Sequence, residues 1–430
     1  MRMGIVGALI SSRPTLYAWA CASLLAACAS KSAPPVAPAA PKPTPQTAPS
    51  ASAREYKVIG YFTNWVENRK GCEFRATDVD PTAFTHINFA FAEVDPGPGG
   101  KLNPNFGIAP FGKEAKLRDP GRDGLYAQLN SLKTKNPNLK TLLSVGGWSH
   151  TDPPMAWLFT SMAETQISRA QFIDNALRYV RDNGFDGIDI DWEYPADPTR
   201  GGRPADKKNF TSLMRELREA IASEAGKTQK PALLLTVATP AGKQADLFEL
   251  GEVTKYVDWI NLMTYDFAGS WEPTTGINAP NMKGGPGVQA AIATYLLSGV
   301  PRDKLVLGMP TYGHTFAGVE TDKPRAPHKG KGPKARCTAE EGSIAYFEVA
   351  ELLKSGQLKR YWDDDTLTPY AYDAKTKMWV TYDDQESFRK KLDVLEENKL
   401  AGAMFWAIDL DDYKGGYPLI STVKERLLKK

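Results

Sequence analysis

The segment 186–195, with the sequence DGIDIDWEYP, constrains the fold more than any other part of this chain. Three acids alternate there with three large apolar residues. The acids are Asp189, Asp191 and Glu193, and the apolar residues between them are Ile188, Ile190 and Trp192. Because side chains alternate between the two faces of a β-strand, the acids share one face and the apolar groups share the other. This pattern indicates a barrel strand that is covered by helices outside and ends in an active site inside. A solvated edge strand is the alternative.

The closeness of the three acids indicates acid–base chemistry. Like charges at short range cannot all ionise freely, so the pKa of at least one carboxyl is raised. A carboxylic acid that keeps its proton near neutral pH is what general acid catalysis requires. Glu193 is the last of the three and is expected to project from the C-terminal mouth of the barrel, where enzymes built on α/β barrels place their active sites. Asp186 has the other parity and is assigned a structural role.

Short apolar runs recur along the chain, and segments of helical period separate them. The expected strands are 56–62, 86–92, 140–146, 187–193, 232–238, 259–265, 304–310 and 403–408, and the clearest helices are 171–180, 209–221 and 383–395. Near-continuous apolar runs are typical of parallel strands that are covered by helices. Eight alternations in 430 residues predict an α/β fold, a (β/α)8 TIM barrel. A doubly wound open sheet is the alternative, but no Gly-rich loop follows the first strand.

One interval, about 311–380, is too long for a simple connection. It contains a Gly and Lys cluster from Lys329 to Lys334, followed by short aromatic runs. Tyr370 and Tyr372 precede an expected turn at 374–377, and Trp379 follows it. We therefore predict a small α+β insertion between strand 7 and its helix, on the functional rim of a single catalytic unit that spans 55–430.

The N-terminal 54 residues have a different composition. Residues 1–27 resemble a signal peptide, because Arg2 and Arg13 precede an apolar run that is too short to span a bilayer. The run ends in LAAC at 25–28, which resembles a bacterial lipobox in which Cys28 is lipidated. Residues 28–54 are rich in Pro and Ala, cannot form a core, and are expected to be a disordered, extended tether.

These features predict an exported bacterial lipoprotein, held at the outer membrane by a lipid anchor only. A secreted protein, cut at a small residue near Ala27 or Ala29, is the alternative. The net charge of +3 falls to +1 when Arg2 and Arg13 leave with the leader, so no nucleic-acid partner is indicated. A monomer is expected.

Two cysteines, Cys72 and Cys337, remain after the leader and Cys28 are set aside. The sequence leaves open whether they form a disulfide, which an oxidising compartment permits, or stay as two unpaired buried thiols. The histidines are scattered and none has Cys or His at metal-ligand spacing, so neither a metal site nor a cofactor is predicted.

Four motifs together resemble the family 18 glycoside hydrolases, the chitinases in particular, from about Tyr56 to the C-terminus. The family's DxxDxDxE motif is matched by Asp186, Asp189, Asp191 and Glu193, SxGG by Ser144, Gly146 and Gly147, MxYD by Met263, Tyr265 and Asp266, and the strand-eight tryptophan by Trp406. The sequence departs from the family at His314, where many members carry Arg after Tyr-Gly.

The resemblance implies hydrolysis of β-1,4-linked N-acetylglucosamine chains with retention, in which the substrate's own acetamido oxygen is the nucleophile. Glu193 would be the general acid, Asp191 would orient the acetamido group, Asp189 would tune Asp191 by sharing a proton, and Tyr265 would bind the acetamido oxygen. Contacts to chitin or chito-oligosaccharides would come from Asp266, Trp406, Trp148 and Met263, with Tyr61 and Ser144 beside Asp189. For Met263, core packing is the alternative.

Other aromatic residues leave two interpretations open. Trp65, Trp271, Trp362 and Trp379 would either line the cleft or fill the core, and Trp271 is the best cleft candidate because it follows the strand-six motif. Two other functions also stay open. One is a chitin-binding lectin-like barrel without activity, and the other is a hydrolase of a different N-acetylated glycan, such as peptidoglycan.

Overall fold

The computed structural model describes residues 55–112, 119–121 and 124–429, and all its elements belong to the unit Arg54–Lys430. The predicted signal peptide, the lipidated Cys28 and the tether at 28–54 lie outside the described residues.

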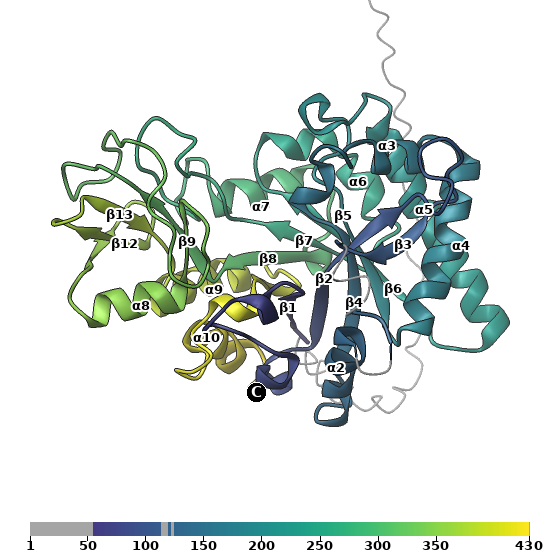
Figure 1. Ribbon diagram of the computed structural model, residues 1–430, viewed down its shortest axis with the longest axis horizontal. Coiled ribbons are helices and arrows are strands. Elements are labelled where there is room, and N and C mark those ends of the chain that lie inside the picture. The colour runs from purple at the N-terminus through teal and green to yellow at the C-terminus, as the bar shows by residue number, and fades with distance from the viewer. Residues whose placement is uncertain (1–54, 113–118, 122–123, 430) are drawn as a thin grey trace, which may run out of the picture. The chain divides into compact units, whose positions relative to one another are not determined.

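Eight parallel strands of the described chain close into a barrel, which confirms the predicted TIM fold (Figure 1). They are β1 (Lys57–Thr63), β2 (His86–Asp95), β4 (Lys140–Gly146), β5 (Gly187–Asp191), β6 (Leu234–Pro240), β7 (Trp259–Met263), β8 (Leu305–Pro310) and β14 (Gly402–Trp406). The first strand pairs with both the second and the last, with Tyr61 opposite Asn88 and Gly60 opposite Phe405. The barrel is therefore closed, and the open-sheet alternative is excluded. A short strand, β3 (Gly107–Pro110), pairs antiparallel with β2.

Helices alternate with these strands along the chain. They are α2 (Leu125–Ser131), α3 (Trp157–Glu164), α4 (Gln166–Asp182), α5 (Asp206–Thr228), α6 (Leu250–Val253), α7 (Val288–Leu297), α9 (Gln385–Glu397) and α10 (Pro418–Leu427). The α4 helix ends at Asp182, with Asn183 as its C-cap, and the Asn183–Gly184 stop agrees with the prediction because Gly184 has a φ of +75° that suits a helix C-terminus. The prediction placed α9 two residues early, because Asp384 is its N-cap and accepts hydrogen bonds from the N–H groups of Glu386 and Ser387.

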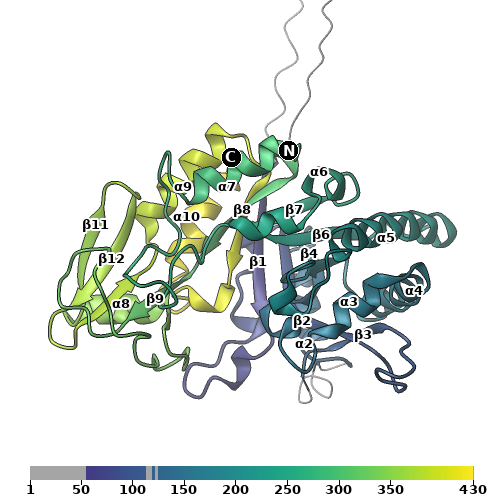
Figure 2. The same ribbon diagram turned by 90° about the horizontal axis from the view of Figure 1, so that it is seen from above.

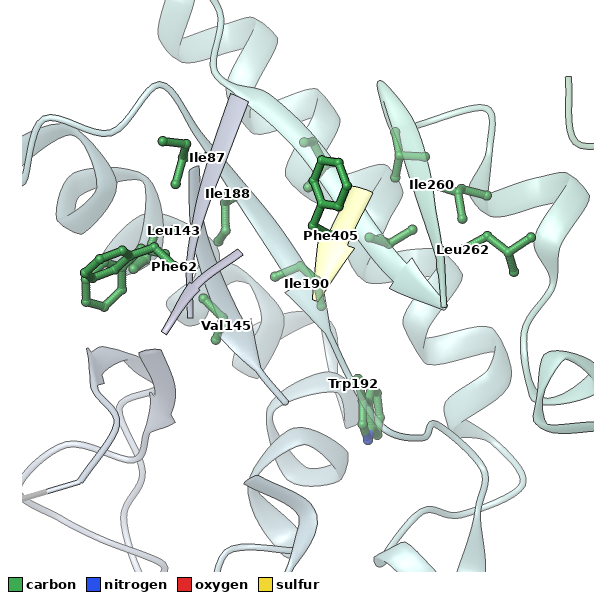
Figure 3. Close-up of a cluster of buried hydrophobic side chains, with 14 of the residues drawn as sticks. Phe62, Ile87, Leu143, Val145, Ile188, Ile190, Trp192, Ile260, Leu262 and Phe405 are labelled. Atoms are coloured by element: carbon green, nitrogen blue, oxygen red, sulfur yellow. The ribbon is translucent and has the colours of Figure 1, made fainter. Parts of the chain in front are cut away.

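The main core lies between the barrel strands and the helices. Figure 3 shows side chains from β1, β2, β4, β5, β7 and β14 on the outer side of the barrel, among them Ile188, Ile190 and Trp192. These three are at most 1% exposed. Burial of each large apolar side chain contributes about 1.5–3 kcal/mol to the stability of the fold. Because side chains alternate along a strand, the burial of Ile188 and Ile190 on the outside fixes which residues of β5 point inward.

The long interval after β8 forms a second, five-stranded sheet and one helix. Its elements are β9 (Tyr312–Phe316), β10 (Ser343–Ala345), α8 (Tyr346–Lys354), β11 (Lys359–Asp363), β12 (Thr368–Asp373) and β13 (Met378–Thr381). The predicted hairpin is confirmed, since Tyr372 pairs with Trp379 across the turn. Figures 1 and 2 place these elements beside the barrel, on the side away from α4 and α5. Trp379 fills the core of the insertion, and Trp362 lies on β11.

Three predicted strands run two residues too far at their C-terminal ends. β5 ends at Asp191, β7 at Met263 and β14 at Trp406. At the C-terminal rim of the barrel, the backbone stops pairing with the neighbouring strand and forms hydrogen bonds with loop residues instead. The carbonyls of Trp406 and Ala407, for example, accept hydrogen bonds from the backbone N–H and the hydroxyl of Thr311.

Cys72 and Cys337 are joined in a disulfide, which settles the alternatives that the sequence left open. The bond links the loop after β1 to the loop between β9 and β10 and spans 265 residues of sequence. None of the helices in the described part of the chain is long and apolar enough to cross a membrane.

Candidate active site

The C-terminal end of β5 is set by the strand beside it. β4 and β5 pair as far as Gly146 and Asp191, where Gly146 adopts a φ of +123°. A Cβ atom on Gly146 would lie 2.0 Å from the carbonyl oxygen of Asp191, so only glycine permits this approach. The N–H of Gly147 then donates to the same oxygen at 2.8 Å. The glycines of the SxGG motif therefore hold the end of the strand that carries the acids.

Asp189 lies inside the barrel and accepts four hydrogen bonds. Its partners are Tyr61 Oη (2.7 Å), Ser144 Oγ (2.7 Å), Thr236 Oγ1 (2.5 Å) and Asn261 Nδ2 (3.2 Å), from four different strands. The structure thus brings Tyr61 and Ser144 beside Asp189, where they were expected. Burial raises the pKa of Asp189, and the four donors oppose that effect.

Asp191 and Glu193 line the cavity above Asp189. Burial, together with the charges of Glu193 and Asp189, raises the pKa of Asp191 well above its ordinary value. Burial and the charge of Asp266 raise the pKa of Glu193 to about 7, although a hydrogen bond from Tyr194 opposes them. Glu193 lies two residues beyond the strand, and its backbone carbonyl is held by Thr151 Oγ1 at 2.7 Å. A carboxyl that is protonated near neutral pH therefore faces the cavity from a fixed backbone.

Tyr265 and Asp266 follow β7 and reach the same cavity. Asp266 adopts a left-handed φ of +59°, and its backbone N–H donates to Asn278 Oδ1 at 2.8 Å. Its Oδ1 atom lies 2.6 Å from Tyr312 Oη and 2.8 Å from His314 Nε2. The residue that departs from the family pattern thus contacts a predicted substrate-binding acid. Met263 packs against the inner barrel cluster and also lines the cavity, so its core packing is observed and its contact with substrate stays a prediction.

The cavity has a volume of about 810 Å³ and an aromatic lining. Trp406 lies against Tyr61 and stacks on Phe91 with ring centroids 5.5 Å apart. Trp148 and Trp271 line the cavity and are 55% and 59% exposed, and the Arg200 guanidinium covers one face of the Trp148 ring, 3.6 Å from its centroid. Trp65 also lines the cavity, whereas Trp362 and Trp379 are not among its lining residues.

Sequence reasoning missed several residues of this site. They are Asn261 and Thr236 beside Asp189, Tyr312 beside Asp266, and Phe91 under Trp406. Asn261 and Thr236 have the inward parity of their strands, which could have indicated them. Asp186 lies at the other end of β5, where it pairs with Lys133 at 2.7 Å, consistent with the structural role expected for it. No cluster of three or more His, Cys, Asp or Glu residues that could hold a metal occurs among the described residues.

Residues 57–411 match the glycosyl hydrolases family 18. The chain belongs to this family. One relative, mouse chitotriosidase-1, is 39% identical to this chain over 390 residues, which cover 86% of this chain and 78% of the relative.

Solved structures agree with this family 18 assignment. A chitinase from Trichuris suis superposes with a TM-score of 0.77 at 32% identity, over 86% of this chain and 99% of that one. Human YKL-39, described as a pseudo-chitinase with retained chitooligosaccharide binding, superposes with a TM-score of 0.76 at 34% identity, over 87% of this chain and 100% of that one. Active and inactive relatives therefore share this fold, and the fold alone does not assign activity.

Proposed function

We propose that this protein is a chitinase that hydrolyses β-1,4 bonds between N-acetylglucosamine residues with retention of the anomeric configuration. The observation that carries the proposal is Glu193. Its carboxyl faces the cavity, and burial raises its pKa to about 7, so it keeps a proton to donate near neutral pH. The chitinases among its relatives add support.

In the proposed mechanism the protein supplies the proton and the substrate supplies the nucleophile. Glu193 protonates the glycosidic oxygen as that bond breaks, while the acetamido oxygen of the sugar bonds to the anomeric carbon. Asp191 orients the acetamido N–H, and Tyr265 donates its hydroxyl hydrogen to the acetamido oxygen. Water then opens the cyclic intermediate with Glu193 as the base, which regenerates its proton. The sugar rings pack on Trp406 and on the exposed face of Trp148.

A lectin-like barrel without activity is the second candidate, because YKL-39, a pseudo-chitinase, superposes well on this chain. The presence of Glu193 with a raised pKa favours the enzyme over the lectin. A binding protein has no need of a buried acid that is protonated near neutral pH.

The test is Glu193→Gln, assayed on a chromogenic chitobioside. We expect turnover to fall by roughly two to four orders of magnitude, the usual contribution of a general acid, while binding of chito-oligosaccharides persists. Glu219→Gln, an exposed acid on the outer helix α5, is the matched control and should retain full turnover. Near wild-type turnover in Glu193→Gln, or no hydrolysis by the wild-type chain, would reject the chitinase. NMR detection of an inverted product would reject the retaining mechanism.

We further propose that the protein is exported and anchored by a lipid on Cys28. The support is the LAAC sequence at 25–28, which follows an apolar run and precedes a Pro-rich segment.

A further inference from the structure

A chain of hydrogen bonds, not used by the mechanism above, runs inside the barrel from an indole to Asp189. Trp259 Nε1 donates to Asn261 Oδ1 at 3.1 Å. Asn261 Nδ2 in turn lies 3.2 Å from Asp189 Oδ1 and 3.3 Å from Tyr61 Oη. All four side chains are at most 2% exposed, so no bulk water competes for these contacts.

The indole fixes the direction of every bond in this chain. An indole N–H can only donate, so Asn261 must turn its oxygen toward Trp259 and its NH2 group toward Asp189. The Tyr61 oxygen accepts one hydrogen of that NH2 group. The hydroxyl hydrogen of Tyr61 is then free to go to Asp189 Oδ2, 2.7 Å away.

The other two hydrogen-bond donors to Asp189, Ser144 and Thr236, show which protonation state of its carboxyl fits the site. Ser144 Oγ and Thr236 Oγ1 contact this carboxyl and have no other hydrogen-bond partner among the described residues. If Asp189 were protonated, one of these hydroxyls would have to accept, and its own hydrogen would be buried without an acceptor. Leaving a buried donor unsatisfied is costly. The ionised carboxylate is the state in which all four donors are satisfied.

Asp191, the neighbouring acid on β5, has the opposite environment. Its Oδ1 atom is buried and has no hydrogen-bond partner among the described residues. Burial and the charges of Glu193 and Asp189 raise the pKa of Asp191 well above its ordinary value. No donor in the described part of the chain therefore stabilises a negative charge on Asp191 Oδ1 in the way that four donors stabilise it on Asp189.

We propose that Trp259 and Asn261 are positioning residues that keep Asp189 ionised and so leave on Asp191 the proton that, by the family resemblance, these two acids share. The catalytic use of that proton rests on the proposed function, but its location in the folded protein does not. The titratable groups that face Asp189 are Tyr61 from β1, Asp191 from β5 and Tyr265 after β7. Burial raises the pKa of both tyrosines well above 10, so Asp191 is the acid whose titration is coupled to that of Asp189 through its charge.

The experiment is a pH titration of the full chain by NMR, with aspartate labelled at the carboxyl carbon and Asp189 and Asp191 assigned from their Asn variants. In the wild type, we expect most of the Asp189 shift change to occur in a lower pH step than that of Asp191. In Asn261→Leu, the Asp189 step should move up by about one pH unit, because one hydrogen bond to a charged group is lost. In Trp259→Phe, Asn261 loses the donor that fixes its orientation, so the Asp189 step should move in the same direction. The acidic limb of kcat/KM should move with it.

Trp379→Phe is the matched control. It removes another buried indole N–H, which donates to the Asp322 carbonyl at 3.2 Å in the insertion, and should leave the Asp189 step unchanged. The proposal is overturned if Asp189 titrates at a higher pH than Asp191 in the wild type. That result does not depend on whether a variant folds. The proposal is also overturned if Asp189 in both variants titrates at the same pH as in the wild type. A wild type that hydrolyses no chitobioside would sink the proposed function and leave the NMR result standing.

Discussion

At the residue scale, three acids on one strand end have three different environments. Asp189 has four donors, Asp191 Oδ1 has none among the described residues, and Glu193 faces the cavity. Three carboxyl groups of the same kind are thus given different proton affinities by their hydrogen bonds and their burial. The alternation in the sequence predicts that the acids lie together. It does not predict Asn261, because that residue lies 72 positions away and only the closed barrel brings it to Asp189.

The pH dependence of the proposed reaction follows from Glu193. Burial and the charge of Asp266 raise its pKa to about 7, so we expect kcat/KM to fall as the pH rises through about 7, where the general acid loses its proton. Asp266→Asn removes one cause of the raised pKa and should move this limb to lower pH, as rate profiles on a chitobioside will show. An unmoved limb would contradict the assignment of the limb to Glu193.

The same raised pKa has a consequence for stability. Between about pH 4.3, where a glutamate in the unfolded chain titrates, and about pH 7, folded Glu193 keeps a proton that the unfolded chain has lost. The contribution of Glu193 to the free energy of unfolding is therefore full below that window and is lost as the pH rises through it.

At the element scale, two loops that are distant in sequence build one wall of the cavity. The loop after β1 supplies Trp65 and Lys70, and the loop between β9 and β10 supplies Arg336 and Cys337. The disulfide from Cys72 to Cys337 ties them together, and Arg336 lies 3.2 Å from Cys72 Sγ. The sequence offered this disulfide as one of two alternatives but could not choose between them, and it did not predict the shared wall, because sequence spacing does not show which loops meet over a barrel.

The double variant Cys72→Ser, Cys337→Ser should therefore be less stable. We expect the free energy of unfolding to fall by about 2–4 kcal/mol, as is typical when a native disulfide is removed. We also expect KM to rise more for long chito-oligosaccharides than for a chitobioside, because the long chains extend to this wall. Urea unfolding and chain-length kinetics measure the two effects. Unchanged urea midpoints, or equal changes in KM for short and long substrates, would argue against this role.

Strand starts were predicted better than strand ends. The apolar runs begin where the ladder begins, because burial of the outward face fixes them. Beyond Asp191 and Met263 the alternation or apolar character continues, but the ladder does not. The apolar pattern of the sequence reports which side chains are buried, not which residues pair in the sheet. At the C-terminal rim of the barrel, side chains stay buried after the backbone has left the sheet, so the predicted strands run too far.

At the scale of the whole molecule, the closed barrel and the α+β sheet beside it could be predicted because eight apolar runs and one overlong interval are visible in the sequence. The N-terminal 54 residues were interpreted from their composition and from the LAAC motif at 25–28. Their role is open to a direct test that the barrel does not influence, because the first barrel strand begins only at Lys57.

That test is lipid labelling in a bacterial host. Cys28→Ala should abolish incorporation of a labelled lipid precursor, whereas Cys21→Ala, a second cysteine of the leader, should leave it intact. Hydrolysis of a soluble chitobioside by the Cys28→Ala protein should equal that of the wild type, because no barrel residue changes. Equal labelling of both variants would refute the anchor.

The pairing of β1 with β14 has a consequence for how the chain becomes active. Tyr61 and Trp406, whose rings lie 5.4 Å apart, come from the first and the last strand of the barrel to be synthesised. Until β14 has left the ribosome, the barrel lacks the strand that pairs with both β1 and β8, and the cavity lacks Trp406. Under the proposed function, a nascent chain that lacks β14 is therefore expected to be unable to hydrolyse glycans, and activity is expected only once β1 and β14 have paired.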